Sequence, residues 1–67
     1  MADSSKLIHI LRRREVERRV GLTRSPLYAR IAAGDFPRPI PLGNGRAVGW
    51  VESEIDQWLA AQLAKRG

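Results

Sequence analysis

Three prolines at alternate positions, Pro37, Pro39 and Pro41, constrain the middle of this 67-residue chain more than any other feature. Proline lacks the backbone N–H that a helix or a central strand needs, so neither can run through this stretch. At alternate positions the missing donors lie on one side of an extended backbone, which suits an edge strand. Residues 43–45 read Gly-Asn-Gly, and Asn-Gly is a strong hairpin signal. We therefore predict a β-hairpin over residues 36–50.

Two short helices are predicted before the hairpin. Val16 and Val20 share one helix face, which indicates a helix over residues 13–20. Gly21 is expected to end it, because glycine readily adopts the left-handed conformation of a helix C-cap. Thr23 is expected to begin the next helix as its N-cap, with its hydroxyl accepting a free backbone N–H of the first turn.

The second helix is expected over residues 24–33, with Leu27 and Ile31 facing inward. Two helices joined by a turn at residues 21–23 form the helix-turn-helix pattern. Glu17 stands out in this pattern, because it occupies a position where a small residue usually lets the two helices approach.

A last helix is expected over residues 51–64, because its apolar residues recur at helical spacing. These residues are Val51, Ile55, Trp58, Leu59 and Leu63. At the other end, residues 1–6 contain little to bury and are predicted to be a disordered leader. Residues 7–11 fit either a first strand or the entry to a helix. We expect residues 7–67 to be one domain, mainly α with a small β-hairpin, arranged as a winged helix-turn-helix.

Composition narrows the functions open to such a domain. The chain has no cysteine and one histidine, so no disulfide, thiolate zinc site or other metal centre is expected. So short a chain leaves little room for a catalytic cleft, and we expect neither an enzyme nor a cofactor. No apolar run approaches the roughly 20 residues that span a bilayer, which favours a cytoplasmic protein.

The placement of charge indicates a polyanion as partner. The formal net charge is +5, and ten of the twelve basic residues are arginines. Arginines crowd the first half of the chain, whereas Glu52, Glu54 and Asp56 form a separate acidic block. Such segregation is typical of a protein that binds a polyanion, although charge alone does not separate DNA from RNA or anionic lipid. We expect about half of the arginines to face solvent only.

Several motifs together resemble one family. They are Leu11-Arg-Arg-Arg-Glu-Val16, Gly21-Leu-Thr-Arg-Ser25, Tyr28, Gly34-Asp-Phe-Pro-Arg-Pro39, Val48-Gly-Trp50 and Ser53-Glu-Ile-Asp-Gln-Trp-Leu59. This pattern resembles the AlpA family of small phage and prophage DNA-binding regulators, related to excisionases and to the MerR-type winged helix-turn-helix. The resemblance covers residues 11–64. Glu17 and Pro26 depart from it, since the family more often has a polar residue in place of Pro26.

The resemblance implies double-stranded DNA as partner and a role in transcription or recombination. If the second helix reads the major groove, Arg24 is expected to contact a base or a phosphate at the helix start. The hydroxyls of Ser25 and Tyr28 would grip phosphate, unless the Tyr28 ring packs against the hairpin instead. Arg46 and the hairpin turn would reach the minor groove or its flanking phosphates. The full set of expected DNA-binding residues is Arg13, Arg14, Thr23, Arg24, Ser25, Tyr28, Arg30, Arg38, Asn44 and Arg46.

Other functions remain open to the sequence. In one, the chain is a protein-interaction adaptor that docks a recombinase or polymerase through the hairpin, Trp50 and Trp58. RNA binding is disfavoured, because no aromatic stacking platform is present. As a DNA-binding protein, the chain would be nucleoid-associated and would work beside an integrase, another recombinase or RNA polymerase. A monomer that binds repeated sites cooperatively is expected.

Overall fold

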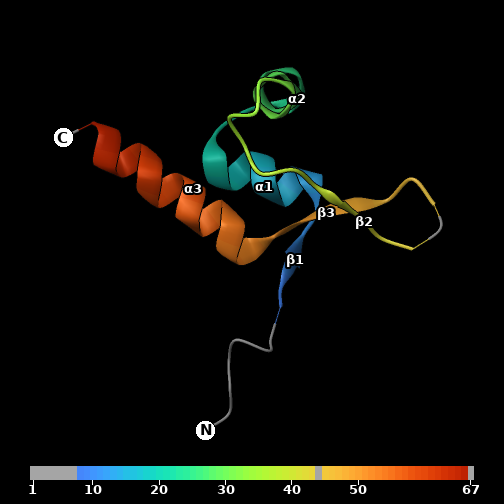
Figure 1. Cartoon of the computed structure of the whole chain (residues 1–67). Helices are drawn as coiled ribbons and strands as arrows, with labels where there is room; N and C mark the ends of the chain where they lie inside the picture. Colours follow the sequence, from blue (N-terminus) through green and yellow to red (C-terminus); the bar gives the residue numbers. More distant parts are fainter. Residues whose placement is uncertain (1–7, 44, 67) are drawn as a thin grey trace, which may run out of the picture.

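The computed structural model describes residues 8–43 and 45–66. The predicted leader at residues 1–6 and the predicted contact residue Asn44 lie outside the described residues. The elements in chain order are β1 (Ile10–Leu11), α1 (Arg13–Val20), α2 (Arg24–Ala32), β2 (Ile40–Pro41), β3 (Val48–Val51) and α3 (Glu52–Lys65), as Figure 1 shows. None of these helices is long and apolar enough to cross a membrane.

The strands form one small antiparallel sheet with β3 in the centre. β1 pairs with β3 at Leu11 and Trp50, and β2 pairs with β3 at Ile40 and Gly49. Residues 10–11 are therefore a strand, which decides between the two readings of the segment after the leader. The predicted fold class, mainly α with a small hairpin, is confirmed, and the sheet has one strand more than the hairpin alone. This architecture is compatible with a winged helix-turn-helix domain.

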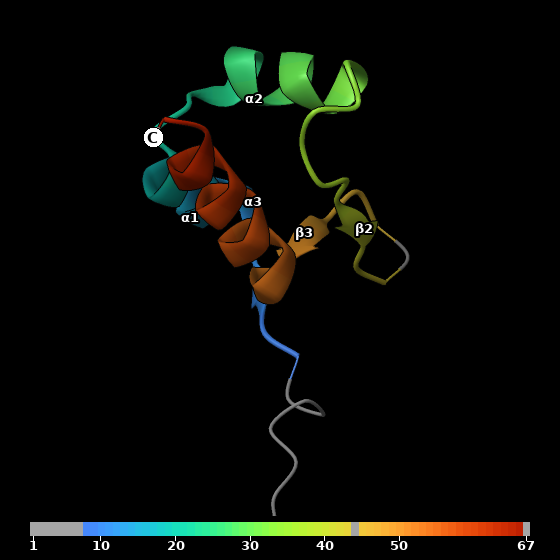
Figure 2. The same cartoon turned by 60° about the vertical axis from the view of Figure 1, so that its left-hand side comes forward.

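The hairpin projects from the body of the molecule, as Figures 1 and 2 both show. The N–H of Leu42 donates to the carbonyl of Ala47 at 2.8 Å, which closes the loop over residues 43–46. Gly43 begins this loop with a φ of 77°, a left-handed conformation that favours glycine. Only Ile40 and Pro41 of the proline-rich segment belong to a strand, because the prolines have no backbone N–H to donate to a ladder.

α1 is followed by Gly21 in the left-handed conformation, with its N–H donating to the carbonyl of Glu17 at 2.8 Å. α2 ends at Ala32, one residue earlier than predicted. The reason is Gly34, whose φ of 79° turns the chain so that the Asp35 N–H donates back to the Arg30 carbonyl at 2.9 Å.

Two further expectations about the helix ends were wrong. Thr23 is the N-cap residue of α2, but its hydroxyl makes no capping hydrogen bond. Its side chain is exposed, so water can serve the free N–H groups instead. α3 covers Glu52–Lys65 rather than residues 51–64, because Val51 still pairs with Ile10 in the sheet.

Every helix contributes to one core. The buried apolar side chains, each at most 8% exposed, are Leu11, Val16, Leu27, Phe36, Trp50 and Ile55. Both tryptophans, expected as core residues, also fix the segment between α2 and β2. The indole N–H of Trp50 donates to the Pro37 carbonyl at 3.0 Å, and that of Trp58 donates to the Asp35 carbonyl at 2.8 Å.

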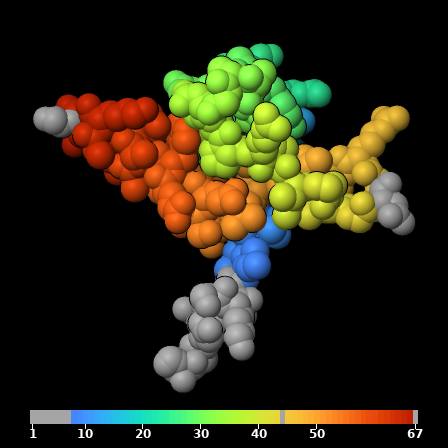
Figure 3. All heavy atoms as spheres, in the orientation of Figure 1, coloured from blue at the N-terminus to red at the C-terminus, as the bar shows by residue number. Residues whose placement is uncertain are grey.

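The predicted apolar face of α3 is only partly covered. Ile55 is fully buried, and Trp58 and Leu59 pack against the core. Leu63, however, is 62% exposed. The reason is that the last turns of α3 extend beyond the rest of the molecule, as the red end of the helix in Figures 1 and 3 shows.

Candidate functional site

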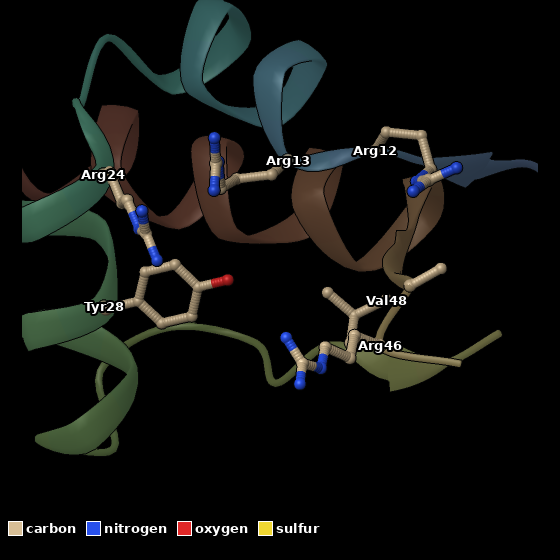
Figure 4. A pocket seen from close by; sticks show the side chains of 7 residues that line it. Arg12, Arg13, Arg24, Tyr28, Arg46 and Val48 are labelled. Atoms are coloured by element: carbon tan, nitrogen blue, oxygen red, sulfur yellow. The ribbon is translucent and has the colours of Figure 1, made fainter. Parts of the chain in front are cut away.

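A concavity lies between the two first helices and the hairpin. Its volume is about 380 Å³. The residues that line it are Arg12, Arg13, Arg24, Tyr28, Arg46, Ala47 and Val48. Figure 4 shows the side chains of Arg13, Arg24, Tyr28 and Arg46 directed toward a common space, with Val48 beside Arg46 and Arg12 set apart. Three separate elements of the fold thus bring four arginines to one place.

The concavity is strongly positive, because no acidic residue lines it. Arg12, Arg24 and Arg46 are exposed, and none of the three has a carboxylate within 4 Å among residues 8–43 and 45–66. Their hydrogen-bond donors are therefore available to a ligand. Closely placed guanidinium groups repel one another, and an anion in the concavity would relieve that repulsion.

The α2 wall is formed by residues one helical turn apart. Arg24 is the first residue of α2, and Tyr28 follows on the same face at i+4. The Tyr28 ring packs edge-on against Trp50, with 6.4 Å between ring centroids. Tyr28 is nevertheless 37% exposed, and its hydroxyl points into the concavity in Figure 4. Tyr28 thus packs its ring against Trp50 and directs its hydroxyl into the concavity at the same time.

The α1 wall includes Arg12, which our predicted contact set missed. Arg12 is the N-cap residue between β1 and α1, with extended backbone angles. The signal that could have found it is its position between an apolar pair and a helix start. Arg13, which was predicted, also lines the concavity, but its Nε lies 3.1 Å from Oε2 of Glu17. The Glu17 side chain reaches back along α1 toward Arg13 and forms this ion pair with it.

The structure separates other predicted contact residues from the concavity. Arg14, Thr23 and Ser25 are exposed but do not line it. Arg30 forms an ion pair with Asp35 at 2.7 Å, and its guanidinium lies 5.6 Å from the centre of the Trp58 ring.

Arg38 lies at a second, shallower depression, which Pro37, Glu54, Gln57 and Trp58 complete. Its surroundings differ from those of the concavity, because an acidic residue shares the depression. Arg30 and Arg38 are therefore both near Trp58, whereas Arg24 and Arg46 face the concavity.

The side of α1 that faces α3 carries the opposite arrangement, in which arginines are paired with acids. Arg19 lies 3.1 Å from Glu15 and 3.1 Å from Glu52, and Arg18 lies 2.6 Å from Glu15. Hydrogen bonds from Arg18 and then Arg19 hold the pKa of Glu15 below its ordinary value. The bond to Glu15 is the main cause that raises the pKa of Arg19, against the effect of desolvation.

The aromatic surface proposed for an adaptor is largely absent. Trp50 is fully buried, and Trp58 is half-buried under Phe36, whose ring centre lies 4.7 Å away. The described residues also contain no group of three side chains that could hold a metal ion.

The fold and this concavity define the class: a small helix-turn-helix domain with a projecting hairpin and a basic surface between them. A family described as "Prophage CP4-57 regulatory protein (AlpA)" matches residues 9–63. The chain belongs to this AlpA family, a family of regulatory proteins, and the resemblance of its motifs is confirmed.

A phage protein supports the same assignment. The chain is 43% identical over 56 residues to "Uncharacterized protein ORF88" of Enterobacteria phage P4. The match covers 84% of this chain and 62% of that protein, so the chain spans about three fifths of the relative's length. No solved structure matches the chain significantly.

Proposed function

We propose that this chain binds double-stranded DNA sequence-specifically, with α2 in the major groove and the hairpin on the adjacent minor groove or backbone. It would act as a small prophage transcriptional regulator or as an excisionase-type recombination directionality factor. The observation that carries the proposal is the concavity itself, where Arg12, Arg24 and Arg46 come together without a carboxylate. In a member of a regulatory family, such a basic surface favours a nucleic acid as the partner.

The spacing of the elements suits a duplex. A major groove about 12 Å wide accepts one helix. A DNA backbone strand borders this groove and separates it from the minor groove. If α2 lies in the major groove, that DNA strand passes between α2 and the hairpin, which is where the concavity lies. Arg24 and Ser25 then lead α2 toward the bases, and Arg46 reaches the other side of the strand.

The remaining contacts follow from the same placement. Arg14 and Thr23 are exposed and would meet flanking phosphates. Asn44 at the hairpin turn would extend the contact made by Arg46. Arg30 and Arg38 are left out of this interface, because the structure places them beside Trp58.

The two regulatory roles share one binding step and differ in the protein that the bound DNA recruits, RNA polymerase or an integrase. We propose a cytoplasmic, nucleoid-associated monomer without enzymatic activity that occupies repeated sites cooperatively. Single modules of this size bury only about 600–1,000 Å² of protein surface on DNA, so repetition of sites would raise occupancy.

A titration tests the proposal. The chain is mixed with the DNA upstream of its own gene and with random duplex, at about 50 and 200 mM salt. We expect tighter binding to the upstream DNA and a steep loss of affinity at the higher salt. Arg66→Ala is the control for general charge effects, because it removes one positive charge at the far end of α3 (Figure 1). Equal affinity for all duplexes would reduce the role to non-specific binding, and no binding would favour the adaptor.

A further inference from the structure

Glu17 is an acidic residue of α1 that does not line the concavity but contacts Arg13, which does. Its Oε2 lies 3.1 Å from Nε of Arg13, one helical turn earlier. The Glu17 side chain is only 23% exposed and that of Arg13 is 38% exposed. Both of these atoms are buried, and neither has a hydrogen-bond partner in the described part of the chain, so the contact between them is an ion pair without hydrogen-bond geometry. Each therefore depends on the other for its charge compensation.

The pair leaves part of the Arg13 guanidinium free. Arginine has five N–H donors, and the guanidinium atom that lies against Glu17 is Nε, 3.1 Å from Oε2. The four donors on the two Nη atoms belong to the exposed part of a side chain that lines the concavity. Figure 4 shows this guanidinium directed toward Arg24 and Tyr28. An arginine alone would sample many rotamers, whereas here a carboxylate on the same helix holds it in one.

Separating Arg13 from Glu17 when an anion binds would cost free energy. If Arg13 turned away, the buried Oε2 of Glu17 would lose its charge partner, and an unpaired buried charge is strongly unfavourable. Arg13 is thus expected to keep its Nε on Glu17 and to offer its Nη groups to a ligand at the same time.

We propose that Glu17 is a positioning residue: it holds Arg13 so that its Nη groups bind a backbone phosphodiester of the DNA strand in the concavity. This inference rests on the proposed DNA binding. It has an unusual consequence, because an acidic residue beside a polyanion then strengthens binding. Coulomb repulsion alone predicts the opposite sign.

The sign of the effect is tested with Glu17→Ala. We expect a threefold to tenfold weaker affinity for the duplex, on the order of the free energy that fixes one long side chain. Glu17→Gln keeps the shape of the side chain without the charge, and because charge holds the pair, we expect it to weaken binding nearly as much as Glu17→Ala. Tighter binding by Glu17→Ala would show that Glu17 only repels DNA and would overturn the proposal.

A double-mutant cycle shows whether the effect passes through Arg13. In the Arg13→Ala chain, Glu17→Ala should no longer weaken binding and should leave affinity equal or higher. If Glu17→Ala weakens both chains equally, its role is in folding, and a parallel fall in Tm would identify that outcome. If the parent chain binds no duplex at all, the proposed function fails as well, which distinguishes the two failures.

Duplexes with single methylphosphonate groups test the ligand. Replacing the phosphate that sits in the concavity removes its charge, so the difference between the parent chain and Glu17→Ala should vanish at that one position in a scan of the site. A difference that persists at every position would contradict a phosphodiester as the partner of Arg13.

Discussion

The arginines of the concavity and the arginines between α1 and α3 differ in their partners. Arg12, Arg24 and Arg46 have no carboxylate nearby in the described part of the chain, whereas Arg18 and Arg19 share Glu15, and Arg19 also reaches Glu52. Arginine thus lines the concavity without an acidic partner on one side of this small domain and forms ion pairs within the fold on the other. The comparison teaches that the number of arginines overstates the positive charge available to a partner, since ion pairs neutralise part of it.

The largest expected effect concerns Arg24 on the concavity side. Arg24→Ala should weaken specific binding by about 1–3 kcal/mol and relax the preference at one position of the site, if Arg24 forms a bidentate contact to a guanine. Affinity measured over a panel of single-base variants checks this. Unchanged affinity across the panel would show that Arg24 does not contact a base. It would also weaken the distinction between the arginines of the concavity and those between α1 and α3.

Arg46 on the hairpin should contribute less, through one phosphate. Arg46→Ala is expected to reduce the slope of log affinity against log salt by about 0.9. Titrations at several salt concentrations give the slope. A slope identical to that of the parent chain would take the hairpin arginine off the DNA.

Arg19 provides the contrast from the paired side. Arg19→Ala should leave the salt slope unchanged, because this guanidinium is already shared by Glu15 and Glu52. It should instead lower Tm slightly, since the contact joins α1 to the start of α3. A changed slope with an unchanged Tm would mean that the pairing yields to DNA.

The smallest effect is a pH dependence at Glu15. Because its pKa is lowered in the folded chain, Glu15 stabilises the fold at pH values above its ordinary pKa, and this contribution is lost as the pH falls through the folded pKa. Glu15→Gln should therefore lower Tm slightly at neutral pH and not in strong acid. A Tm difference that stays constant down to strongly acidic pH would argue against these ion pairs.

Local signals in the sequence account for much of the fold. The spacing of Val16 and Val20 and the glycine after them indicate α1, and Asn-Gly after three prolines indicates the hairpin. These features depend on near neighbours, so the sequence displays them directly. The outcome for residues 10–11 could not be predicted, because pairing with β3 decides it and that partner lies some 40 residues later.

The candidate site was harder to predict for the same reason. Arg24, Tyr28 and Arg46 were expected to contact DNA, and the structure brings them together. Sequence spacing gave no means to see that Arg30 would turn to Asp35 and Trp58. These contacts depend on how α2 and the hairpin fold over the sheet.

The central claim is that the unpaired arginines of the concavity carry DNA binding, and two triple variants of equal charge test it most directly. One is Arg12→Ala, Arg24→Ala and Arg46→Ala, and the other is Arg18→Ala, Arg19→Ala and Arg66→Ala. Each removes three positive charges, and the salt dependence of duplex binding is measured for both. We expect the first to lower the slope by about 1.8, at roughly 0.9 for each of the phosphate contacts of Arg12 and Arg46 because Arg24 reads a base, and the second to leave it nearly unchanged. An equal decrease in both would show that net charge alone drives binding, which would contradict the account.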